Sequence, residues 1–135
     1  MKKIVLLATV VIGSVAVSFT VFSEQQVKPW PVPEASKKLK STVASDPATL
    51  AEAKTLWNTH CKSCHGGKGL GDGSKAAQLK TEPGDFSTAD FQSQTDGSLF
   101  YKLSEGREDM PSFKKKLPDV DERWVLVNFM RTLKK

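Results

Sequence analysis

The most constraining feature of the chain is the pentapeptide Cys61-Lys62-Ser63-Cys64-His65, which contains both of its cysteines. Cys-x-x-Cys-His is the sequence to which haem c is attached. Each thiol adds to one haem vinyl group and becomes a thioether, and one helical turn holds the two thiols at the required spacing. His65 follows directly, and its imidazole can bind the iron. The motif therefore predicts one covalently bound haem c, attached through Cys61 and Cys64.

Three other uses of these residues are weaker. A zinc site needs four ligands in a tetrahedron, and the candidates, His60, Cys61, Cys64 and His65, are too close in sequence to turn toward one ion. A thioredoxin-like redox pair sits in a βαβ unit, and no strand is expected before Cys61. A disulfide across two residues is strained and closes almost no loop. Haem attachment is favoured over all three.

The first 23 residues are expected to be a signal peptide or an N-terminal membrane anchor. A basic start, Met1-Lys2-Lys3, precedes residues 4–22, which carry no charge and are almost wholly apolar. This run is longer than the usual apolar region of a signal peptide, about 7–15 residues, and just reaches the roughly 20 residues of a membrane span. Both interpretations stay open, with a slight preference for the anchor. In either case the rest of the chain is expected in the periplasm or another extracytoplasmic space.

Residues 24–45 contain the run Pro29-Trp30-Pro31-Val32-Pro33 and several lysines. Proline removes backbone donors and fixes φ, so this segment is expected to be extended. A linker between membrane and domain is the favoured interpretation. An exposed Trp30 would be costly, however, so the alternative is an arm that lies across the folded domain.

Residues 46–135 are expected to form a single all-α domain. Asp46 and Pro47 suit a helix start, and Leu50, Ala53, Leu56 and Trp57 follow at helical spacing up to Cys61. The glycine-rich stretch 66–73 predicts a loop. Further helices are expected over 74–79, over 96–105 and from Asp119 onward, where Glu122 would complete a capping box. The core is small for the length, and such domains usually need a prosthetic group.

Met110 is the preferred candidate for the second axial ligand of the iron. Met1 is the start of the chain, and Met130 lies on the apolar stripe of the last helix, which is better explained as core. Met110 stands beside a proline in a loop between two helices, where it has no obvious packing role. His60 directly precedes Cys61, so it is expected to point away from the haem and toward solvent. A methionine thioether favours ferrous iron and raises the reduction potential.

The sequence resembles a single-haem class I cytochrome c over about residues 46–133. The motifs that carry the resemblance are Cys61 to His65, Gly69-Leu70-Gly71-Asp72-Gly73, Pro83-Gly84-Asp85-Phe86, Gly106-Arg107 before Met110-Pro111, and Trp124 with Phe129 to Leu133. The resemblance implies that the first and last helices cross and that loops wrap the haem. It also implies that His65 is the proximal and Met110 the distal ligand. Two positions depart from the family pattern: Ala53 replaces a glycine and Ser74 a proline. A backbone carbonyl near Ser74 would normally accept the proximal histidine N–H.

The resemblance implies electron transfer rather than enzymatic catalysis. A filled sixth position leaves no site for a substrate, so a one-electron carrier or an electron-entry subunit of a respiratory chain is expected. The alternative is a haem enzyme or gas sensor with an open or labile sixth site. The partners would be redox proteins, with Lys114, Lys115 and Lys116 as a basic rim or simply a solvated loop. Although the net charge is +5, acidic and basic residues are interspersed, so nucleic-acid binding is not expected.

Overall fold

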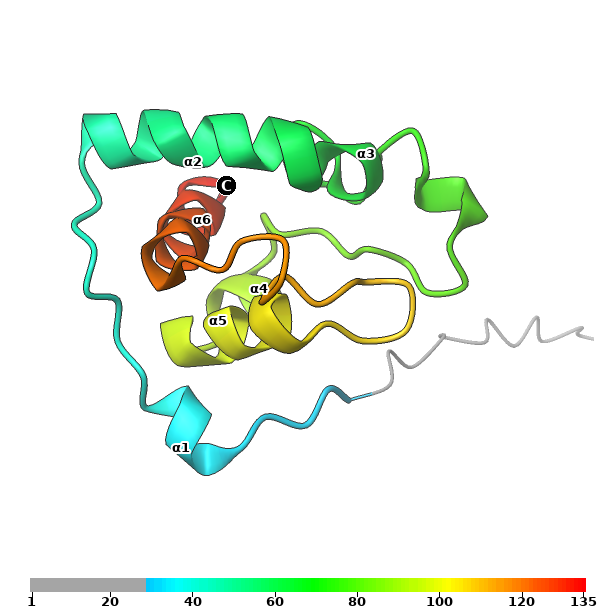
Figure 1. Ribbon diagram of the computed structural model, residues 1–135. Coiled ribbons are helices and arrows are strands. Elements are labelled where there is room, and N and C mark those ends of the chain that lie inside the picture. The colour runs from blue at the N-terminus through cyan, green and yellow to red at the C-terminus, as the bar shows by residue number, and fades with distance from the viewer. Residues whose placement is uncertain (1–28) are drawn as a thin grey trace, which may run out of the picture.

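The computed structural model describes residues 29–135, and all of its regular elements are helical (Figure 1). The only β-type pairing in this part of the chain is an isolated bridge between Arg107 and Met110. The all-α prediction is therefore confirmed. The predicted signal or anchor segment, residues 1–23, lies outside the described residues, as do residues 24–28.

Two long helices cross at the centre of the molecule. Helix α2 (Pro47–His60) packs against helix α6 (Val120–Thr132), and Ala53 and Leu126 are both fully buried. Figure 1 shows α2 running along one edge of the molecule with α6 crossing beneath it. The Ala53 methyl is thus accommodated in the helix crossing where the family pattern has a glycine.

Local capping explains where these helices begin. The Asp46 carboxylate accepts hydrogen bonds from the N–H groups of Ala48 and Thr49, both at 2.9 Å. The Thr49 hydroxyl in turn accepts the Asp46 N–H at 3.1 Å, which completes a capping box. At the start of α6 the Asp119 carboxylate accepts instead from the Asp121 N–H at 2.9 Å, so the partner is not the predicted Glu122.

Helix α5 (Asp96–Glu105) has the predicted bounds and packs against α6. Arg131 of α6 fixes this arrangement, because its guanidinium bonds to the Asp96 carboxylate at 2.7 and 2.8 Å and to the carbonyl of Gln92 at 3.0 Å. Gln92 ends helix α4 (Ala89–Gln92), a short element that the sequence did not predict. In place of a helix over 74–79 there is one 3₁₀ turn, η1 (Ala76–Gln78).

The core consists of two clusters of apolar side chains. The larger cluster brings together side chains from α2, α5, α6 and the loops between the helices. Its buried members are Trp57, Cys61, Phe86, Leu103, Phe113, Leu117, Leu126 and Met130. Met110 and Phe129 pack against it. The smaller joins α5 to α6 through Leu99, Trp124 and Val127. Met130 is 4 % exposed, as expected of a core residue.

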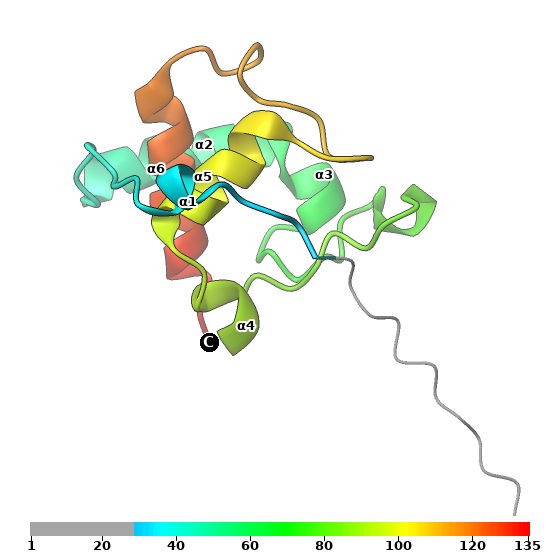
Figure 2. The ribbon, with the colours of Figure 1, turned by 90° about the horizontal axis from the view of Figure 1, so that it is seen from below.

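Residues 29–45 run along the outside of α5 as a strap and do not form a free spacer. They include helix α1 (Glu34–Lys37), which packs against α5. Figures 1 and 2 both show this segment following α5 before it turns toward the start of α2. For residues 29–45 the structure thus supports the second interpretation of the sequence, an arm across the domain. The sequence pattern could not settle this, because the arm is held by contacts with distant residues.

Candidate functional site

The Cys-x-x-Cys-His motif continues directly from α2. Cys61 ends α2, with its N–H bonded to the Trp57 carbonyl at 2.9 Å, and begins the short helix α3 (Lys62–His65). The carbonyl of Cys61 then accepts from Cys64 N–H at 3.1 Å and from His65 N–H at 2.9 Å. The two cysteines are therefore held on one helical turn, as the spacing predicted.

Both cysteines are free thiols with different surroundings. Cys61 is 5 % exposed, within the larger apolar cluster, while Cys64 is half-buried. Burial, together with the neighbouring Cys64, raises the pKa of the Cys61 thiol to about 12. Cys61 is therefore a protonated thiol among apolar side chains, surroundings in which an apolar haem could also be held.

The His65 ring is inserted between aromatic side chains. Its centroid lies 4.7 Å from that of Phe86 and 5.9 Å from that of Trp57. Burial lowers the pKa of His65 to about 4, and the nearby Pro83 carbonyl opposes this shift only in part. The ring is therefore neutral at pH 7, and neutral imidazole is the form that binds a metal.

The His65 Nδ1 atom is buried and, within residues 29–135, has no hydrogen bond of normal geometry. The Pro83 carbonyl is the group that faces the ring, although its approach falls outside that geometry. The sequence had placed the acceptor near Ser74. Ser74 instead lines a surface hollow, together with Lys62 and Ser63.

The glycine-rich loop after His65 wraps closely around the motif. Gly71 N–H bonds to the His65 carbonyl at 3.0 Å, and Gly73 N–H bonds to the Cys64 carbonyl at 3.2 Å. A side chain at position 73 would lie within 2.6 Å of the Cys64 carbonyl oxygen and closer still to that of Ser63. The loop therefore needs glycine at 73 for close backbone approach, which fixes the orientation of the motif.

Met110 lies at the end of a tight turn. Arg107 and Met110 exchange two backbone hydrogen bonds, at 2.8 and 2.9 Å, and Glu108 between them takes a positive φ of 54°. Gly106, with φ 70°, packs directly on the backbone that follows Met110, where a side chain would clash. The Met110 side chain is half-buried and packs on the same apolar cluster that contains Cys61.

A second loop is tied to the Met110 turn. The Asp109 carboxylate accepts from the N–H groups of Lys80 and Thr81 at 2.6 and 3.3 Å. The Glu108 carboxylate accepts from the Thr81 hydroxyl at 2.7 Å. This link between loops far apart in sequence was not predicted, because Glu108 and Asp109 look like ordinary surface carboxylates.

Trp57 and His60 also have roles that the sequence analysis missed. Trp57 was expected only as a core residue, but its Nε1–H also bonds to the Gly66 carbonyl at 3.0 Å. His60 is not fully exposed, since its ring packs edge-on against Phe113 at 6.1 Å. Two surface hollows of about 360 and 500 Å³ flank the glycine-rich loop, and neither is lined by His65 or Met110.

The donor set fits a covalent haem c on these observations. A buried neutral imidazole, two free thiols on one helical turn and a methionine packed on the same apolar cluster as Cys61 are groups that could hold such a haem. The described residues contain no cluster of three or more His, Cys, Asp or Glu side chains that could hold a bare metal ion.

Comparison with known families agrees with this donor set. The family model described as cytochrome c oxidase, cbb3-type, subunit III matches residues 48–130, more than half of the chain. The chain belongs to this cytochrome c family. It is a class I cytochrome c domain, its cofactor is covalent haem c, and its general function is haem-based electron transfer. Cytochrome c domains of this kind typically work outside the cytoplasm.

Solved structures support the same assignment. A c-type cytochrome, KustC0563, is 32% identical, with a TM-score of 0.55 over 62% of this chain and 98% of its own. A mutant of that cytochrome gives 30% identity and a TM-score of 0.53, over 62% of this chain and 99% of its own. The reducing HAO-like protein complex Kustc0457/Kustc0458 of Kuenenia stuttgartiensis contains a chain that is 26% identical with a TM-score of 0.64. That match covers 80% of this chain but 52% of the other, so the cytochrome c domain spans about half of that relative.

A search of curated proteins found no match to the chain. Within residues 29–135, no helix is long and apolar enough to cross a membrane.

Proposed function

We propose that the domain carries one haem c, bound through Cys61 and Cys64, with His65 and Met110 as the axial ligands of the iron. In this proposal it is a one-electron carrier or an electron-entry subunit of a respiratory chain, and not itself an enzyme. The likeness to part of an HAO-like complex is the reason to keep the subunit role beside that of a free carrier.

The observation that carries the proposal is the convergence of the donors on one apolar cluster. Cys61 belongs to this cluster, the His65 ring packs on its members Trp57 and Phe86, and Met110 packs against it. When bound there, the haem iron supplies a one-electron couple between the ferric and ferrous states.

In this electron-transfer mechanism the protein holds the two proposed ligands in place and shields His65 from water. The aromatic rings around His65 bury the imidazole and so keep it neutral, the form in which it could bind the iron. The paired turn from Arg107 to Met110 and the carboxylate of Asp109 would hold Met110 as the other ligand. If His65 and Met110 filled both axial positions, the surroundings would change little between the oxidation states, which would favour fast electron transfer.

The ligation is tested by spectroscopy of the purified holoprotein. We expect a red protein with a sharp reduced α-band and, in the ferric state, the weak near-infrared band of methionine-ligated haem. Met110→Ala should abolish that band, while Met130→Leu, a change in the core, should keep it. If the native reduced protein binds carbon monoxide rapidly, the sixth site is open and the haem enzyme or gas sensor alternative is favoured.

We also propose that residues 4–22 tether the exported domain to the membrane, which follows from their apolar length. The mass of the mature protein distinguishes a chain that begins at Met1 from one cleaved near Glu24. A cleaved chain found only in the soluble periplasmic fraction would exclude the tether.

A further inference from the structure

The strap of residues 29–45 lies against α5 with almost no space between the two backbones. A side chain at Gly97 of α5 would meet the carbonyl oxygens of Ser36 and Leu39. The far end of the strap is fixed as well, since the Asn128 side-chain amide donates to the Val43 carbonyl at 3.2 Å. The strap is therefore part of the folded domain, and these contacts fix where its N-terminal end lies (Figure 2).

The N-terminal end of the strap lies against the turn that contains Met110. The Arg107 guanidinium stacks over the Trp30 ring, 4.5 Å from its centroid, and donates to the Pro29 carbonyl at 3.1 Å. Arg107 is also the residue that exchanges two backbone hydrogen bonds with Met110. A chain of direct contacts thus leads from Trp30 through Arg107 to Met110.

A second cation, Lys102, also lies near the Trp30 ring. The Lys102 ammonium lies 5.6 Å from the same ring and is held by the Gln94 side-chain oxygen at 2.5 Å. The pKa of Lys102 is lowered, first by burial and then by repulsion from the charge of Arg107. The negative face of the indole attracts both of them. The ring therefore offsets part of the repulsion between Arg107 and Lys102.

We propose that Trp30 is a positioning residue for the axial methionine, acting through Arg107. The strap holds one side of the Met110 turn while Asp109, bonded to Lys80 and Thr81, holds the other. Loss of the Trp30 contact weakens the hold on one side of the turn, and Met110 then leaves the iron more often. This inference rests on the proposed role of Met110 as a ligand.

The test uses the full-length holoprotein and measures how fast carbon monoxide binds to the reduced form, because binding requires Met110 to dissociate. We expect Trp30→Ala to bind carbon monoxide about fivefold faster, in line with the strength of a partly buried cation–π contact. Trp30→Phe, which keeps an aromatic face, should stay within about twofold of the wild type. The matched control is Val43→Ala, on the same strap but packed on the Leu99, Trp124 and Val127 cluster. It should lower stability without changing the rate.

The outcomes separate the two proposals. If the wild type shows the near-infrared methionine band, and Trp30→Ala binds carbon monoxide at the wild-type rate, the positioning role of Trp30 is wrong and the ligand assignment stands. Equal acceleration in Trp30→Ala and Val43→Ala also overturns it, because the effect would then be general loosening. Absence of the band in the wild type overturns the ligand assignment, and this inference with it.

Discussion

The Trp57 indole donates its Nε1–H to the Gly66 carbonyl at 3.0 Å, across the nine-residue span that contains the whole attachment motif. Trp57 is 1 % exposed, so this hydrogen bond is shielded from water. It joins the last turn of α2 to the first residue after α3. The hydrogen bond thus connects the residues on either side of the motif without any contribution from the haem.

Trp57→Phe should destabilise the holoprotein, because the Gly66 carbonyl loses its buried donor while most of the ring contacts remain. We expect the free energy of unfolding to fall by about 1–3 kcal/mol, measured by urea denaturation. Phe129→Leu, at a half-buried ring that packs on Trp57, serves as the control for the loss of aromatic contact alone. A Trp57→Phe midpoint equal to that of the wild type would show that the hydrogen bond contributes nothing net.

Gly73→Ala should be far more harmful than Gly67→Ala, although both lie in the same loop. At 73 the added methyl would meet the backbone of Ser63 and Cys64, whereas at 67 its nearest neighbour is the end of the Lys62 side chain at 3.8 Å. We expect Gly73→Ala to cost about 1–3 kcal/mol and Gly67→Ala to stay within about 0.5 kcal/mol of the wild type. Haem content and urea midpoints of the two variants measure this. Equal effects would mean that the loop moves easily away from the motif.

Stability of the holoprotein should fall as the pH decreases from about 6.5 toward 4. The pKa of His65 is about 4 in the folded chain and near 6.5 once the ring is exposed to water. Between these values the unfolded state binds more protons, so acidification favours unfolding, by up to about 1.4 kcal/mol per pH unit. Iron binding acts in the same direction because it excludes the proton.

The control for this pH dependence is His60→Ala, which removes the only other histidine. Asp46 and Asp85 also have lowered pKa values, through hydrogen bonds to Thr49 and Ser87, but their contribution is lost only at lower pH, below about 4. Urea midpoints between pH 4 and 7 should therefore follow the same curve in wild type and His60→Ala. If the urea midpoint of His60→Ala did not change with pH, His60 and not His65 would be the cause of the pH dependence.

Loss of the haem should leave the domain largely unfolded. The larger core cluster includes Cys61 itself and borders both proposed axial ligands, so its packing depends on the group that they hold. The double variant Cys61→Ala/Cys64→Ala is expected to show weak helical circular dichroism and no cooperative thermal transition. A native-like, cooperatively melting double variant would contradict this.

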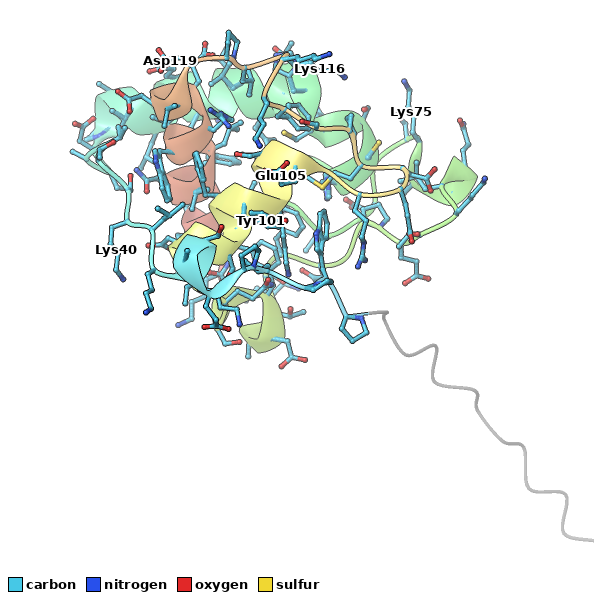
Figure 3. The ribbon with its side chains drawn as sticks, turned by 60° about the horizontal axis from the view of Figure 1, so that its bottom comes forward. Lys40, Lys75, Tyr101, Glu105, Lys116 and Asp119 are labelled. Carbon is cyan, nitrogen blue, oxygen red and sulfur yellow. The ribbon has the colours of Figure 1, made fainter. Side chains whose placement is uncertain are left out.

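Lys115 and Lys116 are the lysines that test the proposed basic rim. Lys114 is less suitable because it pairs with Glu105 at 2.5 Å. Figure 3 shows Lys116 on the loop between α5 and α6, whereas Lys40 projects from the strap on the other side of the view. We expect Lys115→Glu/Lys116→Glu to slow oxidation of the reduced protein by ferricyanide, an anionic oxidant, and to weaken its dependence on salt. Lys38→Glu/Lys40→Glu changes the net charge equally on the strap, and an equal slowing there would show that only the net charge matters.

Local sequence determined much of the helical framework. The cap at Asp46, the proline that follows it and the apolar spacing up to Trp57 act within a few residues, so α2 could be predicted, as could α5. Helix α1 could not be, because a four-residue helix after a proline-rich run is held by its packing on α5 around Gly97. The predicted capping partner at α6 was also wrong, since the Asp119 carboxylate accepts from the Asp121 N–H instead.

The sequence by itself predicted the haem chemistry, because the proposed attachment through Cys61 and Cys64 depends on a spacing along the chain that any fold must keep. Tertiary structure decided what surrounds it. Pro83 rather than Ser74 faces the His65 ring, and Trp30 reaches the Met110 turn through Arg107. These contacts join residues far apart in the chain, and no local pattern encodes them. They arise because burial of the apolar faces of α2, α5 and α6 against one another brings the connecting loops together.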